Sequence, residues 1–526
     1  MSTKNTYNSL PFFGKRFLNI SEQQFAQIHK SIETAQKNKS IETTQKNKIS
    51  ILPHQKKVYD FLQQNKSILL FHKMGSGKTI SSLYSAIKFN KPTIIIGQKS
   101  SKKSFMDDLD KLEIILDTTI DKTNFTFYTF QKAQNLMQSQ FDLLKDKIVI
   151  IDEAHHLRSQ TIQMMFIINS IPLAYKCILL TGTPIINHPI DLCVLVNIIK
   201  NKEIFTIDKS LFDFYYVNYE LNNDLSNNDL SNNDLSNNIM SNNTISNKSL
   251  PIVIYNMVDE LKSKLSNCIS FYEPSSSSSN LKINIFYPEV PLNTNQLLEY
   301  KNYIVRLINP MTKRIVHLET DIDAESYNVD FITLDIKKKN AFLTATRQLS
   351  NTVDNDPNSP KILEVVEMVL KGPKPVVIYS NFLANGIYPI SVKLMEYGIS
   401  HKMIKGSTTD EKMNKIINEY NEGLFDVLLI SSAASESVTL LKTRQIHILE
   451  PHFNEAKINQ VIGRAIRYKS HDKLPISEKQ ISIYHWTSIF PTTIQYKTAD
   501  QYLIWLGKKK QVLIDKFIEL IKEVSI

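Results

Sequence analysis

The residues best suited to chemistry in this 526-residue chain form a short glycine turn that ends in a lysine and a threonine. Residues 75–79 read Gly-Ser-Gly-Lys-Thr, between an apolar run at 67–71 and a segment with apolar residues at helical spacing, 80–89. A strand, a glycine turn and a helix are the setting that a phosphate-binding loop needs. Glycines let backbone N–H groups converge on phosphate oxygens, and the positive end of the helix adds to that attraction. The sequence therefore predicts a nucleoside triphosphate site here.

Different residues of the loop are expected to bind the phosphates and the metal ion. Those expected to line the phosphates are Met74, Gly75, Ser76, Gly77, Lys78 and Thr79. Lys78 can reach the β- and γ-phosphates, and the Thr79 hydroxyl can hold Mg²⁺. The usual pattern begins with a glycine where this chain has His72. That departure leaves a chance glycine turn open as the alternative.

A pair of acidic residues lies 74 residues beyond the loop lysine and directly after the apolar run 147–151. Asp152 can hold Mg²⁺ beside the phosphates, and Glu153 can orient and deprotonate the attacking water. His155 is expected to connect these acids to neighbouring motifs. The alternatives are a strand end with solvated acids and a metal site made by His155 and His156. Adjacent side chains diverge, which disfavours the second.

A glutamine precedes the loop. Gln55 closes the run Leu-Pro-His-Gln at 52–55, just before the first apolar strand. Its amide offers one donor and one acceptor, which suits the edge of adenine. An exposed glutamine at a helix start is the plain alternative. Beside a phosphate loop, adenine contact is favoured.

The elements expected to position these residues are strands that alternate with helices. Apolar runs bounded by turns occur at 67–71, 93–97, 125–130, 147–151 and 177–181, and again at 375–379, 426–430 and 445–449. An amphipathic helix is predicted at 360–370, and the apolar spacing over 496–526 also indicates a helix. Continuous apolar strands separated by helices indicate parallel sheets covered on both faces. The sequence thus predicts an α/β fold.

Four motifs together resemble those of superfamily 2 helicases. Asp-Glu-Ala-His at 152–155, Thr-Gly-Thr-Pro at 181–184 and Gln-Val-Ile-Gly-Arg-Ala-Ile-Arg at 460–467 look like motifs II, III and VI, and the glycine turn looks like motif I. The Thr-Gly-Thr-Pro form is similar to the Swi2/Snf2-like branch. Over about residues 49–520 the chain also resembles ATPases of large cytoplasmic DNA viruses, of the poxvirus early transcription factor small subunit and nucleoside triphosphate phosphohydrolase I type. The segments that carry this likeness are 359–362, 378–380, 430–437, 447–451 and 463–467.

The resemblance implies two RecA-like domains with ATP and Mg²⁺ between them. Gln55 corresponds to the adenine-contacting glutamine of the family. Asp152 and Glu153 correspond to its metal-binding and water-activating acids. Thr181 and Thr183 would link hydrolysis to domain movement.

The second domain would supply a further set of residues by the same resemblance. Gln460, Arg464 and Arg467 fall in motif VI, and both arginines would reach across the cleft to the γ-phosphate. An arginine there is worth about three to five orders of magnitude in GTPases. Glu436 matches the motif V carboxylate, whereas Ser437 stands where the family has glycine. A degenerate, inactive ATPase is the alternative, although every charged catalytic position is filled.

Five segments are predicted along the chain. They are a polar N-terminal extension with a nine-residue repeat (1–48), a RecA-like ATP-binding domain (49–200), an inter-domain region (201–358), a second RecA-like domain (359–490) and a C-terminal helical tail (491–526). Residues 222–250 repeat Leu-Ser-Asn-Asn-Asp and have too little apolar surface to fold, so we expect a disordered, low-complexity loop inserted there. The sequence does not order the strands and helices of 250–345.

The amino-acid composition limits which partners and which cellular compartment are expected. The formal net charge of +10 favours a polyanionic partner, although most of the 62 basic and 52 acidic residues make an ordinary solvated surface. No run of about 18 apolar residues and no apolar N-terminal signal occurs, so no membrane partner is expected. Three cysteines far apart indicate a reducing compartment and no zinc site. The viral resemblance implies a virion and host-cytoplasm location.

The sequence therefore predicts a DEAH-box, ATP-dependent helicase or translocase on DNA or RNA, acting in viral transcription. RNA polymerase or a second transcription-factor subunit are the implied protein partners. One alternative is an ATP-binding transcription-factor subunit that recruits or remodels a complex on DNA without unwinding. Another is an ATPase switch that does not use nucleic acid. Stimulation of ATPase activity by nucleic acid separates the last from the other two, and strand displacement separates the first from the second.

Overall fold

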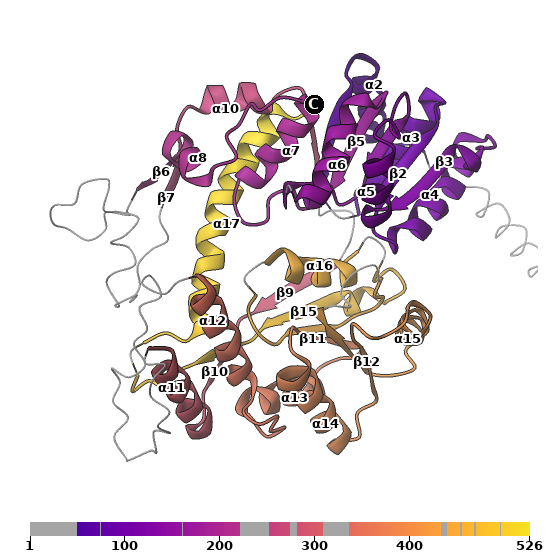
Figure 1. The fold of residues 1–526 in the computed structure, drawn as a ribbon. Coiled ribbons are helices and arrows are strands. Elements are labelled where there is room, and N and C mark those ends of the chain that lie inside the picture. Colours follow the sequence, from indigo (N-terminus) through magenta and orange to yellow (C-terminus); the bar gives the residue numbers. More distant parts are fainter. Residues whose placement is uncertain are drawn as a thin grey trace, which may run out of the picture. The chain divides into compact units, whose positions relative to one another are not determined.

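A computed structural model (Figure 1) describes residues 50–73, 75–159, 161–220, 252–273, 281–308, 336–432, 439–452, 455–467, 470–494 and 496–526. The expectations for the N-terminal repeat at 1–48 and for the insertion at 222–250 lie outside these residues. Two parallel sheets of six strands each dominate the described part of the chain. This confirms the predicted α/β fold class with two parallel-sheet domains.

The first sheet has the strand order β3-β2-β4-β5-β1-β8, and every neighbouring pair is parallel. Its strands are β1 (Ser67–His72), β2 (Thr93–Gly97), β3 (Phe125–Thr129), β4 (Ile148–Ile151), β5 (Lys176–Thr181) and β8 (Ile269–Tyr272). The first five match the predicted apolar runs to within one residue at each end. β8 comes from the region that the sequence did not order, and it pairs with β1 at the edge of the sheet.

Helices flank this sheet and bury its strands. They are α2 (Pro53–Gln64), α3 (Lys78–Phe89), α4 (Ser101–Leu116), α5 (Phe130–Ser139), α6 (Ile162–Ser170) and α7 (Ile190–Lys200). Two further helices, α8 (Lys209–Tyr216) and α10 (Val258–Leu265), contribute buried residues to the same apolar core. All four side chains of β4 are fully buried, as a continuous apolar strand inside a parallel sheet should be. A short antiparallel ribbon, β6 (Val217–Glu220) with β7 (Ile252–Tyr255), lies next to α8 in the chain.

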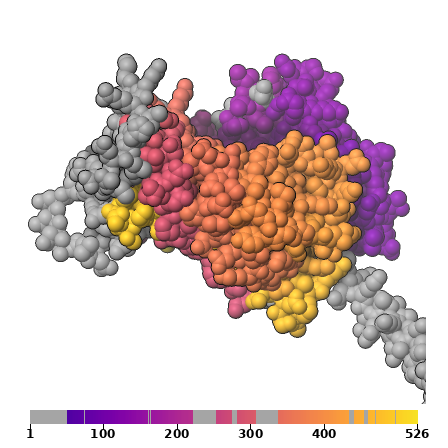
Figure 2. Space-filling model, turned by 90° about the horizontal axis from the view of Figure 1, so that it is seen from below, coloured from indigo at the N-terminus to yellow at the C-terminus, as the bar shows by residue number. Residues whose placement is uncertain are grey.

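The second sheet has the order β12-β13-β11-β14-β15-β9, again with parallel pairs throughout. Its strands are β9 (Lys282–Phe286), β11 (Val376–Ser380), β12 (His401–Ile404), β13 (Val427–Ser431), β14 (Gln445–Ile448) and β15 (Gln480–His485), and its helices are α13 (Pro360–Lys371), α14 (Tyr388–Glu396), α15 (Asp410–Glu422) and α16 (Glu455–Ala465). Figure 2 shows one face of this domain, mostly in orange. The three predicted strands and the predicted helix appear within one residue of their expected bounds.

The C-terminal helix α17 (Ala499–Val524) confirms the predicted helical tail. A capping box between Thr498 and Gln501 fixes its first turn. Tyr502 packs in an apolar cluster with α11 (Thr294–Ile308) and α12 (Ile336–Asn351), whereas Phe517 belongs to the core on the first sheet. β10 (Glu289–Pro291) and β16 (Thr487–Ile489) pair nearby. Among the described helices, none combines the length and apolarity that a bilayer crossing requires.

A buried ion pair connects the start of α17 to α13. Lys361 Nζ lies 3.0 Å from Asp500 Oδ2, and the two side chains are 1% and 0% exposed. Lys361 also donates to Asn351 Oδ1 at 3.2 Å, and Asp500 Oδ2 accepts the Ser488 N–H at 3.1 Å. An unpaired charge in the interior is costly, so each partner makes the burial of the other tolerable.

Asp500→Asn should lower the free energy of unfolding by about 3–5 kcal/mol, because it leaves the Lys361 ammonium buried without its counter-ion. Urea unfolding measures this loss. The exposed pair of Lys371 and Glu367 is the matched control, and Glu367→Gln should leave the unfolding midpoint nearly unchanged. The double variant Lys361→Met/Asp500→Leu should recover much of the loss. A midpoint for Asp500→Asn equal to that of the control would contradict this account.

Candidate active site

The phosphate loop begins where β1 ends. Gly75 and Gly77 both have a φ of 78°, a left-handed conformation that glycine adopts without strain. Gly77 is the N-cap of the 12-residue helix α3, whose unpaired first-turn N–H groups therefore face the loop. A Cβ on Gly77 would lie 2.5 Å from Gln55 Nε2, so a side chain there would displace that amide as well as strain the left-handed backbone. The loop and Gln55 are thus in direct contact.

Lys78 is the first residue of α3, and its side chain turns back into the loop. Its Nζ donates to the His72 carbonyl oxygen at 2.9 Å. Burial lowers the pKa of Lys78 below its ordinary value, and the negative charges of Glu153 and Asp152 act in the opposite direction. The Lys78 amine therefore lies in the electric field of Asp152 and Glu153. It donates a hydrogen bond to a carbonyl oxygen, and a phosphate oxygen could replace that acceptor.

The two acids follow β4, and their surroundings separate them. Burial and the neighbouring charge of Glu153 raise the pKa of Asp152 to about 6, against a hydrogen bond from the Ser101 side chain and the charge of Lys78. Burial also favours a higher pKa for Glu153, but the hydrogen bond and charge of His155, with the charge of Lys78, bring that pKa below its ordinary value. Neighbouring acids with opposite shifts are suited to different tasks.

His155 connects the acids to the next motif. Its Nδ1 lies 3.2 Å from Glu153 Oε2 and 3.3 Å from Thr181 Oγ1. Thr181 Oγ1 in turn accepts the Thr183 N–H at 3.1 Å. The parallel pairing of β1 with β5 places Phe71 opposite Thr181, beside the start of the loop. Side chains of motifs II and III are therefore in contact, and the pairing of β1 with β5 places them beside the start of the loop.

The second domain carries its candidate residues on and just after α16. Gln460 and Arg464 lie one turn apart on this helix. Arg467 lies two residues beyond the helix end and donates from Nη1 to Thr439 Oγ1 at 2.8 Å. Burial lowers the pKa of Arg467 below its ordinary value. These residues are grouped within their own domain, and their approach to a phosphate remains a prediction.

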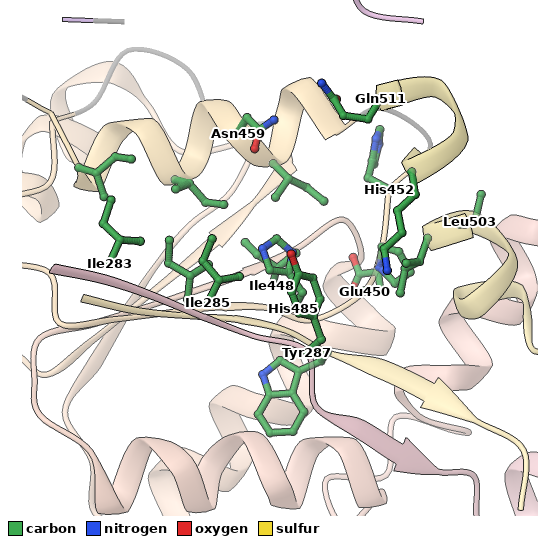
Figure 3. A pocket seen from close by; sticks show the side chains of 18 residues that line it. Ile283, Ile285, Tyr287, Ile448, Glu450, His452, Asn459, His485, Leu503 and Gln511 are labelled. Carbon is green, nitrogen blue, oxygen red and sulfur yellow. The ribbon is translucent and has the colours of Figure 1, made fainter. Parts of the chain in front are cut away.

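A cavity of about 420 Å³ lies against the face of α16 that carries Ile458 and Ile462 (Figure 3). Ile458 and Ile462 of the helix line it, together with Ile283 and Ile285 of the edge strand β9. Polar side chains line the cavity as well, among them His452, Lys508 and Gln511. The cavity shows that Ile458 and Ile462 lie on the inward-turned face of α16.

Two predicted site residues, Met74 and Glu436, lie outside the described residues, as does Ser437. The remaining first-domain candidates converge at the carboxyl edge of the first sheet. Sequence reasoning missed one neighbour of the loop, His54, whose Nε2 lies 3.0 Å from the Ser76 carbonyl oxygen. Because His54 directly precedes Gln55 in the sequence, its place in the chain could have indicated that it lies near the loop.

Comparison with known proteins decides the family. The SNF2-related domain model matches residues 92–244, and the helicase conserved C-terminal domain model matches residues 360–469. A protein of Acanthamoeba polyphaga mimivirus that bears the name of an ATP-dependent RNA helicase, L538, is 38% identical over 475 residues, which are 90% of this chain and 97% of that protein. The chain belongs to the SNF2-related superfamily 2 helicases. This confirms the predicted family and makes the chain a helicase-family ATP hydrolase.

Two further relatives are also viral. The termination factor NPH-I homolog of African swine fever virus is 24% identical over 576 residues, covering 88% of this chain and 76% of that protein. Nucleoside triphosphatase I of Melanoplus sanguinipes entomopoxvirus is 24% identical over 520 residues, covering 89% of this chain and 77% of that protein. These two viral proteins therefore match this chain over most of its length.

Lys78→Ala should reduce ATP hydrolysis to background, because the phosphates lose the Lys78 ammonium while the glycine backbone of the loop is kept. Glu153→Gln should still bind nucleotide but turn over about 10²–10⁴-fold more slowly, because only the proton acceptor is lost. Steady-state ATPase assays and nucleotide titrations measure both effects.

Lys88→Ala, at the exposed end of the same helix, is the matched control for the lysine variant and should keep wild-type turnover. Normal hydrolysis in a folded Lys78→Ala protein would remove the site assignment. A collapse of nucleotide affinity in Glu153→Gln would reverse the roles of the two acids.

Proposed function

We propose that the chain is an ATP-dependent nucleic-acid helicase or translocase that acts in the transcription of a large DNA virus. The observation that carries the proposal is the half-buried ammonium of Lys78, which donates to the His72 carbonyl oxygen in the field of Asp152 and Glu153, next to a left-handed glycine turn. His155 connects Glu153 to Thr181 in the same site. A desolvated cation beside two acids with opposite pKa shifts supports a phosphate-cleaving centre.

ATP is the proposed substrate and Mg²⁺ the proposed cofactor. Thr79 and Asp152 would hold the metal, which prefers oxygen ligands. The residues fit this ion, because burial and Glu153 raise the pKa of Asp152 to about 6 and a metal would supply the missing countercharge. Bound there, Mg²⁺ would polarise phosphate oxygens and neutralise developing charge.

The protein groups would then each perform a limited step. Lys78 would exchange the His72 carbonyl oxygen for a phosphate oxygen. Glu153, kept ionised by its lowered pKa, would accept a proton from the water that attacks the γ-phosphorus. Gln55 would contact the adenine edge, which its position over Gly77 supports. The residues whose backbone would surround the phosphates are Met74, Gly75, Ser76 and Gly77.

The second domain would complete the site when the domains close. Arg464 and Arg467 would neutralise charge on the γ-phosphate, with Gln460 beside the nucleotide. The residues proposed to couple hydrolysis to closure are His155, Thr181, Thr183 and Glu436. Nucleic acid that contacts both domains would favour the closed form by binding it better. The proposed domain ranges remain 49–200 and 359–490, with β8 and β9 from the intervening region completing the two sheets.

Nucleic acid, DNA or RNA, is the partner class of this helicase. The net charge of +10 supports contact with a phosphate backbone, and sequence-independent contact suits a motor that meets different bases at each step. RNA polymerase or a second transcription-factor subunit are the proposed protein partners, and virion and host cytoplasm the proposed locations. The name of the African swine fever virus relative, a termination factor, supports this setting.

A second function has its own support. Two relatives are named a termination factor homolog and a nucleoside triphosphatase rather than helicases. The chain would then bind ATP and DNA within a transcription complex without unwinding. Strand-displacement assays on duplex DNA and RNA–DNA hybrids separate the two. Displacement that depends on ATP supports the helicase, and ATP-dependent activity without displacement supports the transcription-factor subunit.

ATP turnover should be slow in the free protein and should rise with added DNA or RNA, because closure would need a ligand that contacts both domains. The stimulation should fade as salt rises, since the contacts are mainly to phosphates. Arg467→Ala should remove most of the stimulated rate and leave nucleotide-free nucleic-acid binding nearly unchanged. The measurement is ATP turnover against nucleic-acid concentration at two or more salt concentrations.

Lys402→Ala, which removes an exposed basic residue paired with Glu419 in the same domain, is the matched control and should keep the stimulated rate. A wild-type rate indifferent to every DNA and RNA tried would favour the ATPase switch. A stimulated rate that survives Arg467→Ala would reject that arginine and leave Arg464 as the candidate.

A further inference from the structure

The residue directly before Gln55 contacts the phosphate loop. His54 lies in the first turn of α2, and its Nε2 is 3.0 Å from the Ser76 carbonyl oxygen. A carbonyl oxygen only accepts, so Nε2 must carry the hydrogen and donate it. The imidazole therefore ties the start of α2 to the middle of the loop.

Two other rings fix the orientation of His54. Its imidazole stacks on Tyr272, at the end of β8, with ring centroids 3.6 Å apart and planes 7° apart. It also meets His72 edge to face at 5.6 Å. His72 is fully buried, and its Nε2 lies 3.0 Å from Ser270 Oγ on β8. We refer to His54, His72 and Tyr272 as the aromatic cluster.

The aromatic cluster meets the loop at two points. His72 is the last residue of β1, and its carbonyl oxygen accepts the Lys78 ammonium. Ser76 lies within the turn, which is closed by its own N–H to the Lys73 carbonyl oxygen at 3.3 Å. A glycine at position 72, as in the usual motif, could not reach Ser270. The side chain that departs from the motif is therefore an anchor of the loop to β8.

We propose that His54 is a positioning residue for the phosphate loop. Stacked on Tyr272, it holds the Ser76 carbonyl so that the neighbouring N–H groups stay directed at the phosphates. This inference rests on the nucleotide site of the proposed function and adds a role for a residue to which the sequence analysis assigned none. A loop with two left-handed glycines has many alternative conformations, so a fixed carbonyl reduces the ordering cost of binding.

The expected effect is on nucleotide binding more than on the chemical step. His54 contacts a loop carbonyl and not the reacting atoms, so its loss should weaken ground state and transition state alike. Uniform weakening raises KM and leaves kcat nearly unchanged. The net value of one such hydrogen bond corresponds to about a 2- to 10-fold change in affinity.

Two conservative variants of the full chain separate this role from simple packing. The amide nitrogen of glutamine reaches as far as Nε2 of histidine, whereas that of asparagine reaches only as far as Nδ1. Calorimetric titration with ADP should show near-wild-type affinity for His54→Gln and about 2- to 10-fold weaker binding for His54→Asn. The ATPase KM should follow the same order with kcat conserved. Lys57→Asn, an exposed neighbour on α2, is the matched control and should match wild type.

Equal affinities of His54→Asn and wild type would overturn the proposal, and so would equal losses in both histidine variants. If His54→Asn does not fold, Tyr272→Phe and Tyr272→Val replace it, because phenylalanine keeps the stacking face and valine removes it. The proposal then requires weaker ADP binding in the valine variant alone. A wild-type protein that binds no ADP at all would instead sink the proposed nucleotide site, which makes that failure distinguishable.

Discussion

The parallel pairing of β1 with β5 on one side and β8 on the other is the constraint on which the rest of the site depends. Parallel strands present their carboxyl ends at one edge of a sheet, so segments far apart in the chain end beside one another. Phe71 pairs with Thr181 and His72 with Tyr272, and β4 delivers Asp152 next to β5. The phosphate loop therefore lies between the hydrolytic motifs and an edge strand that anchors it.

Because these strand ends lie side by side, the charged side chains that follow them are close together and shift one another's pKa values. Lys78, Asp152 and Glu153 are all half-buried, and at such sites unlike charges attract and like charges repel more strongly than they do in water. The lysine pKa falls, the Asp152 pKa rises and the Glu153 pKa falls because His155 stabilises its ionised form. A nucleotide with its metal would change every one of these interactions at once, as expected of a site that responds to its ligand.

The sequence predicted the fully buried strands β2 and β4 well because their signal is local. β2 and β4 are continuous apolar runs between turns, and the motif residues follow them at fixed offsets. β8, β9, β12 and β15 were not predicted, because none of them is buried along its whole length and each therefore lacks a continuous apolar run. Contacts such as Lys361 with Asp500, or His54 with Ser76, join residues far apart in the chain through packing that no local pattern encodes. The contact of His72 with Ser270 on β8 explains why a histidine, and not the usual glycine, can stand at the start of the loop.

The central claim is that the loop after β1 binds the phosphates of ATP through Lys78. A structure of the protein with Mg²⁺ and a non-hydrolysable ATP analogue tests it most directly. The account predicts that Lys78 Nζ leaves the His72 carbonyl oxygen, now at 2.9 Å, and lies within hydrogen-bonding distance of a β- or γ-phosphate oxygen. Thr79 and Asp152 should lie at the metal. Nucleotide bound elsewhere, or Lys78 still on the His72 carbonyl with the phosphates out of reach, would contradict it.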